Sequence, residues 1–391
     1  MKKIALILTG GTIGSKNIEH IIDVGEDTVY QLVSAYEEAY GEKDIFEVFS
    51  PFQSLSENFT KTEWQKLCDL LWDFPFEKYE GVVIAHGTDT LSYTAALVAM
   101  LFADKGVPIT LIASNYPIGA EGSNGVRNLR GAVNFIRQQV ANGVFVVYEN
   151  AVGDIEVFLG TRLLPADNVL DQYGSFAGPC FGVMKEEGFF CNKNERAPLP
   201  EELKENRKAL LPEELNQNEK VCSLNEWDRN GKTSSLEHLN RNKEGELQKE
   251  TITKSNSNQS FFKKPIHFTR DILFLMPYPG QNYQYISLDN KPAAVFHYLY
   301  HAGTACVKAD NYSFLEFLKR CQQEQIPCYV ASIKAGSKDA YATGNDILQQ
   351  GAIPLYDISP IAGYMKLLLA YNQTERPIEE VLGHNFFYEQ V

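Results

Sequence analysis

Long apolar runs and paired cysteines are both lacking in this sequence. No stretch of the 391 residues reaches membrane-spanning length, and the early apolar run, Ile4 to Leu8, is too short for the core of a signal peptide. The seven cysteines form no Cys-x-x-Cys pair, and an odd number cannot all pair within one chain. We therefore expect reduced thiols, a cytoplasmic protein and no association with membranes.

Basic residues are scarce relative to acidic ones. The chain has 36 Lys and Arg against 50 Asp and Glu, which gives a net charge of −14. Such a balance disfavours attraction to phosphate backbones and to anionic lipid headgroups. We therefore expect no nucleic acid among the partners of this protein.

Sequence patterns for metals and cofactors are also missing. The seven histidines show no ligand spacing with acids or cysteines. His297 and His301 stand four apart on a predicted helix, but without an HExxH pattern or a third ligand. The stretch TGGTIGS matches neither GxGxxG nor the phosphate-loop pattern, although its N–H groups leave anion binding open. We expect no metal and no cofactor.

The sequence does have enough hydrophobic residues, 44% of the chain, for two domains with separate cores. Short apolar stretches alternate with amphipathic ones over its first part. Strands are expected over residues 2–9, 81–85 and 108–114, and helices over residues 26–41, 60–73, 92–104 and 126–143. This alternation predicts a mostly parallel sheet flanked by helices. Residues 144–150 and 154–164 then predict a hairpin.

The composition changes between residues 191 and 270. Here 28 of 80 residues are charged and aromatic residues are few, as is typical of an inserted or linking segment. After residue 270 strands and helices alternate again, with a helix predicted over 291–303. We expect an α/β protein with a larger N-terminal domain (1–190), the charged segment, and a smaller C-terminal α/β domain (271–391).

Two glycine-threonine loops follow predicted strands. TGGTIGS, with Thr12, follows the first strand, and HGTDTLS, with Thr88, Asp89 and Thr90, follows residues 81–85. Taken alone, each loop fits a structural role, as a strand-ending turn or as a helix cap. In open parallel sheets, however, ligands bind beyond the carboxyl ends of the strands. If the two loops converge there, their two hydroxyls and one carboxylate are suited to attack and hold a polar carbonyl compound.

In this order and spacing, ILTGGTIGS and VVIAHGTDTLSYTA resemble the two signature segments of the bacterial-type L-asparaginase and glutaminase family. The resemblance runs from the first strand to about Gly182 and resumes from Asp271 to the end of the sequence. It implies an amidohydrolase that releases ammonia from a side-chain amide through an acyl-enzyme on threonine, with neither metal nor cofactor.

The resemblance also implies roles for individual residues. Thr12 occupies the position of the nucleophilic threonine, and Thr88 and Asp89 those of an activated second threonine and of the aspartate that contacts the substrate ammonium. The stretch SLSENFTKTEW places Ser56 where a hydroxyl holds the substrate carboxylate, with Glu57 beside it. A threonine hydroxyl is a weak nucleophile until a base or a positive neighbour assists it, and N–H groups at helix starts suit a developing oxyanion.

One departure from the family concerns a lysine. Pro165 stands where the family has the lysine that completes its Thr-Lys-Asp arrangement. Arg162 is close in sequence, but an offset of three along an extended strand directs it to the opposite face, and arginine stays protonated. Lys185 and Lys334 are candidates to replace the missing lysine, although nothing in the sequence places either of them at the site.

A second departure concerns the loop NYPIGAEGSNG. Tyr116 stands where the family commonly has arginine, and Asn124 where it commonly has aspartate. The identity of the substrate is therefore less constrained by the sequence than the fold.

Two main hypotheses follow. The first is hydrolysis of the side-chain amide of L-asparagine or a related small amide. The alternative is an asparaginase-like protein that binds or senses a small molecule, with catalysis impaired because of Pro165. A third hypothesis, nucleotide binding by the glycine-rich loops, lacks its sequence signatures. The expected ligand is a small amino-acid amide, and the resemblance implies a homodimer or homotetramer.

Overall fold

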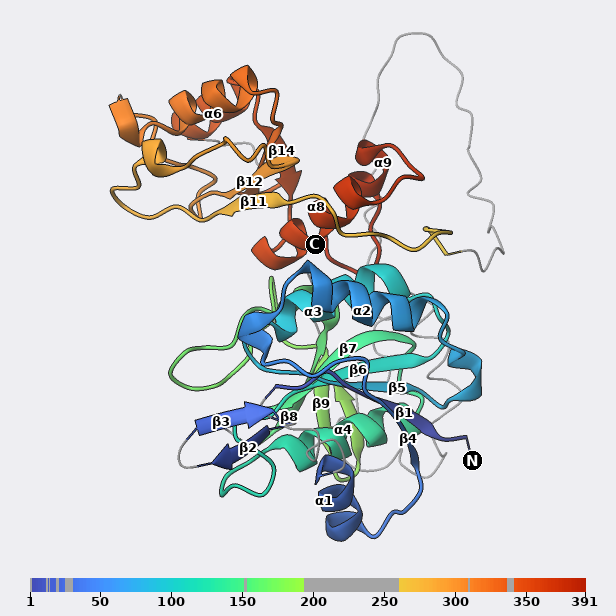
Figure 1. The fold of residues 1–391 in the computed structure, drawn as a ribbon. Coiled ribbons are helices and arrows are strands. Elements are labelled where there is room, and N and C mark those ends of the chain that lie inside the picture. Colours follow the sequence, from blue (N-terminus) through green and yellow to red (C-terminus); the bar gives the residue numbers. More distant parts are fainter. Residues whose placement is uncertain are drawn as a thin grey trace, which may run out of the picture.

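The fold is that of a computed structural model, shown in Figure 1. The structure describes residues 2–11, 13, 15–18, 21–24, 31–150, 153–192, 260–308, 310–335 and 341–391, with the backbone alone for 15–18 and 21–24. Thr12, the predicted nucleophile, lies outside the described residues.

The N-terminal part is built on one eight-stranded sheet with the order β10-β9-β8-β7-β6-β5-β1-β4. Its strands are β1 (Ile4–Leu8), β4 (Phe46–Phe49), β5 (Val82–Ala85), β6 (Pro108–Ile112), β7 (Gly143–Glu149), β8 (Ile155–Leu159), β9 (Gly182–Lys185) and β10 (Gly188–Cys191). Neighbouring strands pair in parallel from β4 through β1, β5 and β6 to β7. The pairs β7–β8, β8–β9 and β9–β10 are antiparallel. This confirms the mostly parallel sheet and the predicted hairpin, β7 and β8. An unexpected antiparallel pair, β2 (Ser15–Ile18) and β3 (Ile21–Val24), follows β1.

Helices cover both faces of this sheet (Figure 1). One face carries α1 (Gln31–Tyr40) and α4 (Gly125–Arg137), and the other carries α2 (Lys61–Trp72) and α3 (Leu91–Phe102). Helix α3 is apolar on nearly all sides and almost completely buried. Its outer surface is covered by α8 (Pro360–Asn372), a helix from the far end of the chain.

A second, four-stranded parallel sheet lies in the C-terminal part, in the order β11-β12-β13-β14. Its strands are β11 (Ile272–Leu275), β12 (Ala294–Tyr298), β13 (Cys328–Ile333) and β14 (Ile353–Tyr356). Helices α6 (Phe314–Gln323) and α7 (Ala342–Gln349) pack on one face, α8 packs on the other, and α9 (Ile378–Gly383) follows α8. Short 3-10 helices are η3 (Ser56–Asn58), η4 (Phe76–Lys78), η5 (Gly160–Arg162), η8 (Tyr283–Tyr285) and η9 (Asp310–Tyr312).

The predicted helix over 291–303 is wrong, because this segment contains strand β12. Both faces of β12 are covered, with Val295 in the cluster beneath α6 and Phe296 in the cluster beneath α8. A strand buried on both faces has a continuous apolar run, which periodicity alone does not distinguish from a buried helix. His297 therefore points into the core, where its Nε2 lies 2.9 Å from the Tyr283 hydroxyl, while His301 is exposed.

The division at residues 190 and 271 stays a prediction, since most of the charged segment lies outside the described residues. Its described end packs against the N-terminal part. Gln65 donates from Nε2 to the Ile266 carbonyl oxygen at 3.0 Å and accepts from the Phe268 N–H at 2.9 Å. In the described ranges, no helix is long and apolar enough to span a membrane. The thiols of Cys68, Cys180, Cys306, Cys321 and Cys328 form no disulfide there.

Candidate active site

Three loops meet beyond the carboxyl ends of β4, β1 and β5, which are neighbours in the sheet. The Gly11 N–H donates to the Ser54 carbonyl oxygen at 2.9 Å, and the Ser54 N–H donates to the Thr9 carbonyl oxygen at 3.1 Å. On the other side, the Thr9 N–H and hydroxyl both donate to the Ala85 carbonyl oxygen. These bonds extend the sheet pairing past the strand ends and hold the loops in a fixed relation.

Glycine is required where these loops approach one another. A Cβ atom on Gly11 would lie closer than 3.0 Å to the Gly87 backbone, and one on Gly87 would lie closer than 3.0 Å to the Ser56 side chain. Gly11 also has a φ of 76°, in the left-handed region. The close approach that the two glycine-threonine loops predict is therefore present.

Ser56 and Asp89 are joined by two hydrogen bonds. The Ser56 hydroxyl donates to the Asp89 Oδ2 atom at 3.2 Å, and the same hydroxyl oxygen accepts from the Asp89 N–H at 3.2 Å. Ser56 is buried, with 2% exposure, whereas Asp89 is exposed. Asp89 thus presents a carboxylate to solvent from a fixed loop, beside a hydroxyl.

The helix-cap interpretation of this loop is not what the structure shows. Thr90 occupies the N-cap position of α3, but its side chain does not cap the helix. Its hydroxyl donates instead to the Ser56 carbonyl oxygen at 3.0 Å. The Asp89 carboxylate likewise bonds Ser56 across the loop crossing. Both residues therefore join the two loops together.

Thr88 is half-buried, and its main chain is held by a residue that the sequence does not mark. The Tyr173 hydroxyl donates to the Thr88 carbonyl oxygen at 2.8 Å. Burial, followed by the nearby Tyr148 and Asp89, raises the pKa of Tyr173 well above its usual value. Tyr173 and Thr88 are 85 residues apart, so no local pattern connects them. Among the described residues, none hydrogen-bonds the Thr88 hydroxyl.

Glu57, which the resemblance places beside the substrate-binding serine, is exposed on η3. Its carboxylate makes no hydrogen bond within the described part of the chain, whereas its neighbour Ser56 points inward. The structure therefore brings Ser56, Thr88 and Asp89 together and leaves Glu57 at the rim.

In the described part of the chain, none of the cationic residues considered as lysine replacements hydrogen-bonds Thr88. Pro165 is exposed. Arg162 lies in the 3-10 helix η5 and not in the extended strand that was expected, and its buried guanidinium donates from Nε to the Tyr388 carbonyl oxygen at 2.6 Å. Lys185 lies over the Phe190 ring on the antiparallel edge of the sheet, 5.6 Å from its centroid, and Lys334 is exposed beyond β13.

His86 lies directly beneath the site and is fully buried. Its Nδ1 atom is 2.8 Å from the Gly87 carbonyl oxygen, which can only accept, so Nδ1 carries the proton. No hydrogen-bond partner for Nε2 is found among the described residues. Burial lowers the pKa of His86 to about 4, against the opposing effects of the Gly87 carbonyl and Asp89. The ring is therefore neutral at physiological pH and supports the loop without carrying charge.

The loop after β6 lies beside the site. Asn124 is buried, and its carboxamide accepts from the Asn115 N–H and donates to the Glu149 carbonyl oxygen, each at 3.0 Å. Tyr116 is 47% exposed. A cavity of about 360 Å³ opens here, bordered also by Tyr148.

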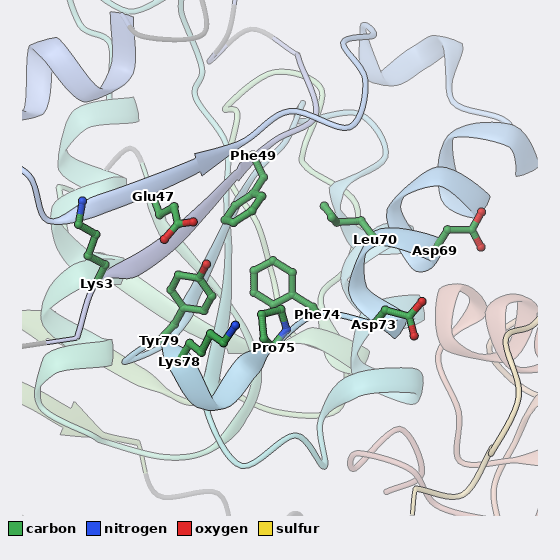
Figure 2. Close-up of a pocket in the computed structure, with 10 residues that line it drawn as sticks. All are labelled: Lys3, Glu47, Phe49, Asp69, Leu70, Asp73, Phe74, Pro75, Lys78 and Tyr79. Carbon is green, nitrogen blue, oxygen red and sulfur yellow. The ribbon is translucent and has the colours of Figure 1, made fainter.

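A cavity of about 580 Å³ lies elsewhere on the N-terminal part (Figure 2). The rings of Phe49, Phe74 and Tyr79 pack against one another at its centre. Lys3 precedes β1 and Tyr79 precedes β5, so this cavity lies toward the amino ends of those strands. Because none of Ser56, Thr88 and Asp89 lines it, it is separate from the candidate active site. Within the described ranges, no cluster of His, Cys, Asp and Glu is arranged to hold a metal ion.

Comparisons with known proteins identify relatives of the N-terminal part of the chain. The family model described as Asparaginase, N-terminal matches residues 3–170, which include all three converging loops. L-asparaginase from Thermococcus kodakarensis is 28% identical over 186 residues, covering 47% of this chain and 54% of that protein. One of the glutamyl-tRNA(Gln) amidotransferase subunits from Pyrococcus abyssi is 31% identical over 159 residues, covering 39% of this chain and 35% of that protein. The chain thus spans only about half or less of the length of these curated relatives.

The fold similarity extends further than the sequence similarity. The solved structure of L-asparaginase I from Vibrio cholerae matches with a TM-score of 0.67 at 22% sequence identity, covering 100% of this chain and 99% of that one. The expected architecture, a large sheet flanked by helices and a smaller parallel sheet, is therefore that of solved L-asparaginases.

Proposed function

We propose that this protein is an amidohydrolase of the asparaginase family, because its residues 3–170 match the model of the asparaginase N-terminal domain and resemble curated L-asparaginases. Its proposed substrate is the side-chain amide of L-asparagine or a related small amide, which it hydrolyses to the acid and ammonia. The observation that carries the proposal is the junction of Ser56, Asp89 and Thr88 at the sheet edge where Gly11, the residue before Thr12, also lies.

The proposed reaction has two steps. The Thr12 oxygen bonds to the amide carbon, the carbon–nitrogen bond breaks, and the hydroxyl proton leaves with the nitrogen as ammonia. Water then adds to the resulting ester, which releases the acid and restores the hydroxyl. Thr88 supplies the second hydroxyl of this chemistry. Ser56 holds the carboxylate of the substrate and Asp89 holds its ammonium. The 3.2 Å hydrogen bond between the two side chains keeps these two binding groups side by side.

Ammonia release from a panel of small amides tests the proposal. The wild type is expected to act on at least one of them, and Thr12→Ala and Thr88→Val are each expected to reduce kcat by at least about 100-fold. Thr62→Val, at an exposed position on α2, is the matched control and should keep the wild-type rate. Full activity in Thr12→Ala would remove the acyl-enzyme from the mechanism.

One observation favours a second function. Pro165 is exposed, and no lysine of the described ranges hydrogen-bonds Thr88. A protein with this pocket and without an effective base would bind or sense a small amino acid. Calorimetry separates the two functions, because tight binding of asparagine or aspartate without turnover supports sensing. In that case Pro165→Lys is expected to introduce measurable turnover.

The assembly state is part of the proposal. We expect a homodimer or homotetramer located in the cytoplasm, in which a neighbouring subunit completes the site. Light scattering of the intact chain measures this directly, and a monomer that turns over its substrate would contradict it.

A further inference from the structure

The segment that carries Pro165 returns to the candidate site through one side chain, Tyr173. We propose that Tyr173 is a positioning residue, whose hydroxyl holds the Thr88 peptide so that the Thr88 hydroxyl faces the reacting amide. The proposal rests on the proposed function. In this segment Pro165 stands where the family has a charged lysine. The segment would then act on the site through the main chain of Thr88.

Contacts other than the one with Thr88 fix the position of Tyr173. Its N–H donates to the Asn150 Oδ1 atom at 2.9 Å, and its carbonyl oxygen accepts from Asn150 Nδ2 at 3.2 Å. Asn150 Nδ2 also donates to the Glu156 carboxylate on β8. The Tyr173 ring meets the Tyr148 ring edge-on, at 4.8 Å between centroids and 79° between planes. Two neighbouring strands of the sheet thus fix Tyr173 independently of Thr88.

The hydrogen bond from Tyr173 acts on one particular peptide unit. That unit contains the Thr88 carbonyl and the Asp89 N–H. Tyr173 donates to its carbonyl at 2.8 Å, and the Ser56 hydroxyl accepts from its N–H at 3.2 Å. With both ends of the peptide plane held, the backbone of Thr88 has one orientation, and the direction of its Cα–Cβ bond follows from it.

Tyr173 is placed to orient Thr88 and not to exchange protons. Its proton is directed at a main-chain carbonyl, which does not accept it fully at any working pH. Burial keeps the pKa of Tyr173 well above its usual value, so the hydroxyl remains a donor. The residue is 4% exposed and has no path to bulk solvent comparable with that of Asp89. Its removal should therefore lower the rate equally across the pH range.

The test compares two substitutions in the same ring pair. Tyr173→Phe keeps the ring contact and removes the hydrogen bond to Thr88. Tyr148→Phe removes a buried hydroxyl for which the described residues provide no hydrogen-bond partner. We expect Tyr173→Phe to lower kcat for ammonia release by about 10- to 100-fold and to change KM by less than about threefold. The reason is that a displaced Thr88 hydroxyl slows the chemical step more than it weakens substrate binding. Tyr148→Phe should retain kcat within about twofold.

Three results would overturn the proposal: wild-type kcat in Tyr173→Phe, an equal loss in both variants, or a pH profile that changes shape in Tyr173→Phe. If the wild type is inert on every amide, the proposed function fails and hydrogen exchange decides the positioning role. Exchange of the peptide covering residues 86–91 is expected to rise in Tyr173→Phe and not in Tyr148→Phe. Equal exchange in the two variants would then reject the role of Tyr173.

Discussion

At the scale of single residues, the candidate site depends on how closely backbones approach one another. Gly87 lies where the loop after β5 meets Ser56, and there is no room for a methyl group at its Cα. Ser56 in turn holds both the N–H and the carboxylate of Asp89. A displacement of Ser56 is therefore transmitted to Asp89 directly.

Gly87→Ala tests this packing. The added Cβ is expected to displace Ser56, to lower kcat/KM by about 10- to 100-fold, and to reduce the free energy of unfolding by about 1–3 kcal/mol. Gly383→Ala at the end of α9 is the matched control, since a Cβ there meets nothing within 4 Å. Amide turnover and urea unfolding of both variants measure the difference. Equal behaviour of the two variants would show that the loop crossing is not tightly packed.

Two buried histidines make stability depend on pH. Burial lowers the pKa of both His86 and His297 to about 4, whereas a histidine in the unfolded chain has a pKa of 6.5. Between these two pKa values the unfolded chain binds protons that the folded protein does not. The contribution of the two neutral histidines to the free energy of unfolding is therefore fully present above pH 6.5 and is lost as the pH drops toward 4. Each histidine contributes up to about 3 kcal/mol to this loss.

Urea unfolding at a series of pH values measures this effect. His297→Gln is expected to flatten the dependence between pH 6.5 and 4. His301→Gln, at an exposed position, should leave it unchanged. An unchanged slope in His297→Gln would mean that the core accommodates the charged ring.

The sequence contains the signal for some of these residues and not for others. Ser56, Thr88 and Asp89 lie in local patterns of glycine and hydroxyl residues, and the structure brings them together. Tyr173 could not be predicted, because its contact joins positions 85 residues apart and depends on how the segment after β8 folds back. The role of Thr12 stays a prediction, since it lies outside the described residues.

At the scale of elements, helix α2 begins at a capping box formed by Thr60 and Glu63. The Thr60 side chain accepts from the Thr62 N–H at 3.2 Å, and the Glu63 carboxylate accepts from the Thr60 N–H at 2.9 Å. The helix start lies only a few residues after Ser56, so this cap also fixes the end of the site loop.

Thr60→Ala removes this cap. We expect it to lower the free energy of unfolding by about 1 kcal/mol, because the Thr62 N–H loses the hydroxyl oxygen that accepts from it and the Glu63 carboxylate loses the Thr60 hydroxyl. Thr62→Ala is the control, as the Thr62 side chain is exposed and the cap uses only its N–H. Thermal unfolding of the two variants measures the difference. A larger loss in Thr62→Ala than in Thr60→Ala would contradict the assigned cap.

Elements with strong periodicity are predictable from the sequence, and short or doubly buried ones are not. The positions of α2 and α4 follow from their apolar spacing. Strand β12 has a pattern that predicts a helix, because apolar side chains cover both of its faces. Strand β4, of only four residues, has too short a pattern to stand out, although it forms one edge of the sheet and leads into the loop with Ser56.

At the scale of the whole molecule, the end of the chain returns to the N-terminal part. The Thr161 hydroxyl donates to the Phe387 carbonyl oxygen, and Arg162 donates to the Tyr388 carbonyl oxygen. The tail that these residues form, 386–391, is anchored in the core by a fully buried ion pair. It joins Lys366 of α8 and Glu389, which lie 2.9 Å apart. The tail therefore connects α8 to η5, from which the segment bearing Tyr173 departs.

Glu389→Ala tests the anchor. It leaves the Lys366 ammonium and the Phe386 and Phe387 N–H groups without the acceptor that they share, so we expect a loss of about 3–5 kcal/mol in the free energy of unfolding. The double variant Lys366→Met with Glu389→Leu should recover part of that loss, because no charge then stays buried alone. Urea unfolding measures both. Single and double variants that both match the wild type would show that the tail is not anchored in solution.

The most direct test of the account is ammonia release from L-asparagine by the intact protein, measured with and without hydroxylamine. An acyl-enzyme on Thr12 is expected to transfer its acyl group to hydroxylamine, so the wild type should release ammonia and form the aspartyl hydroxamate, while Thr12→Ala should do neither. Absence of ammonia release by the wild type, from asparagine and from every other small amide tested, would contradict the proposed function.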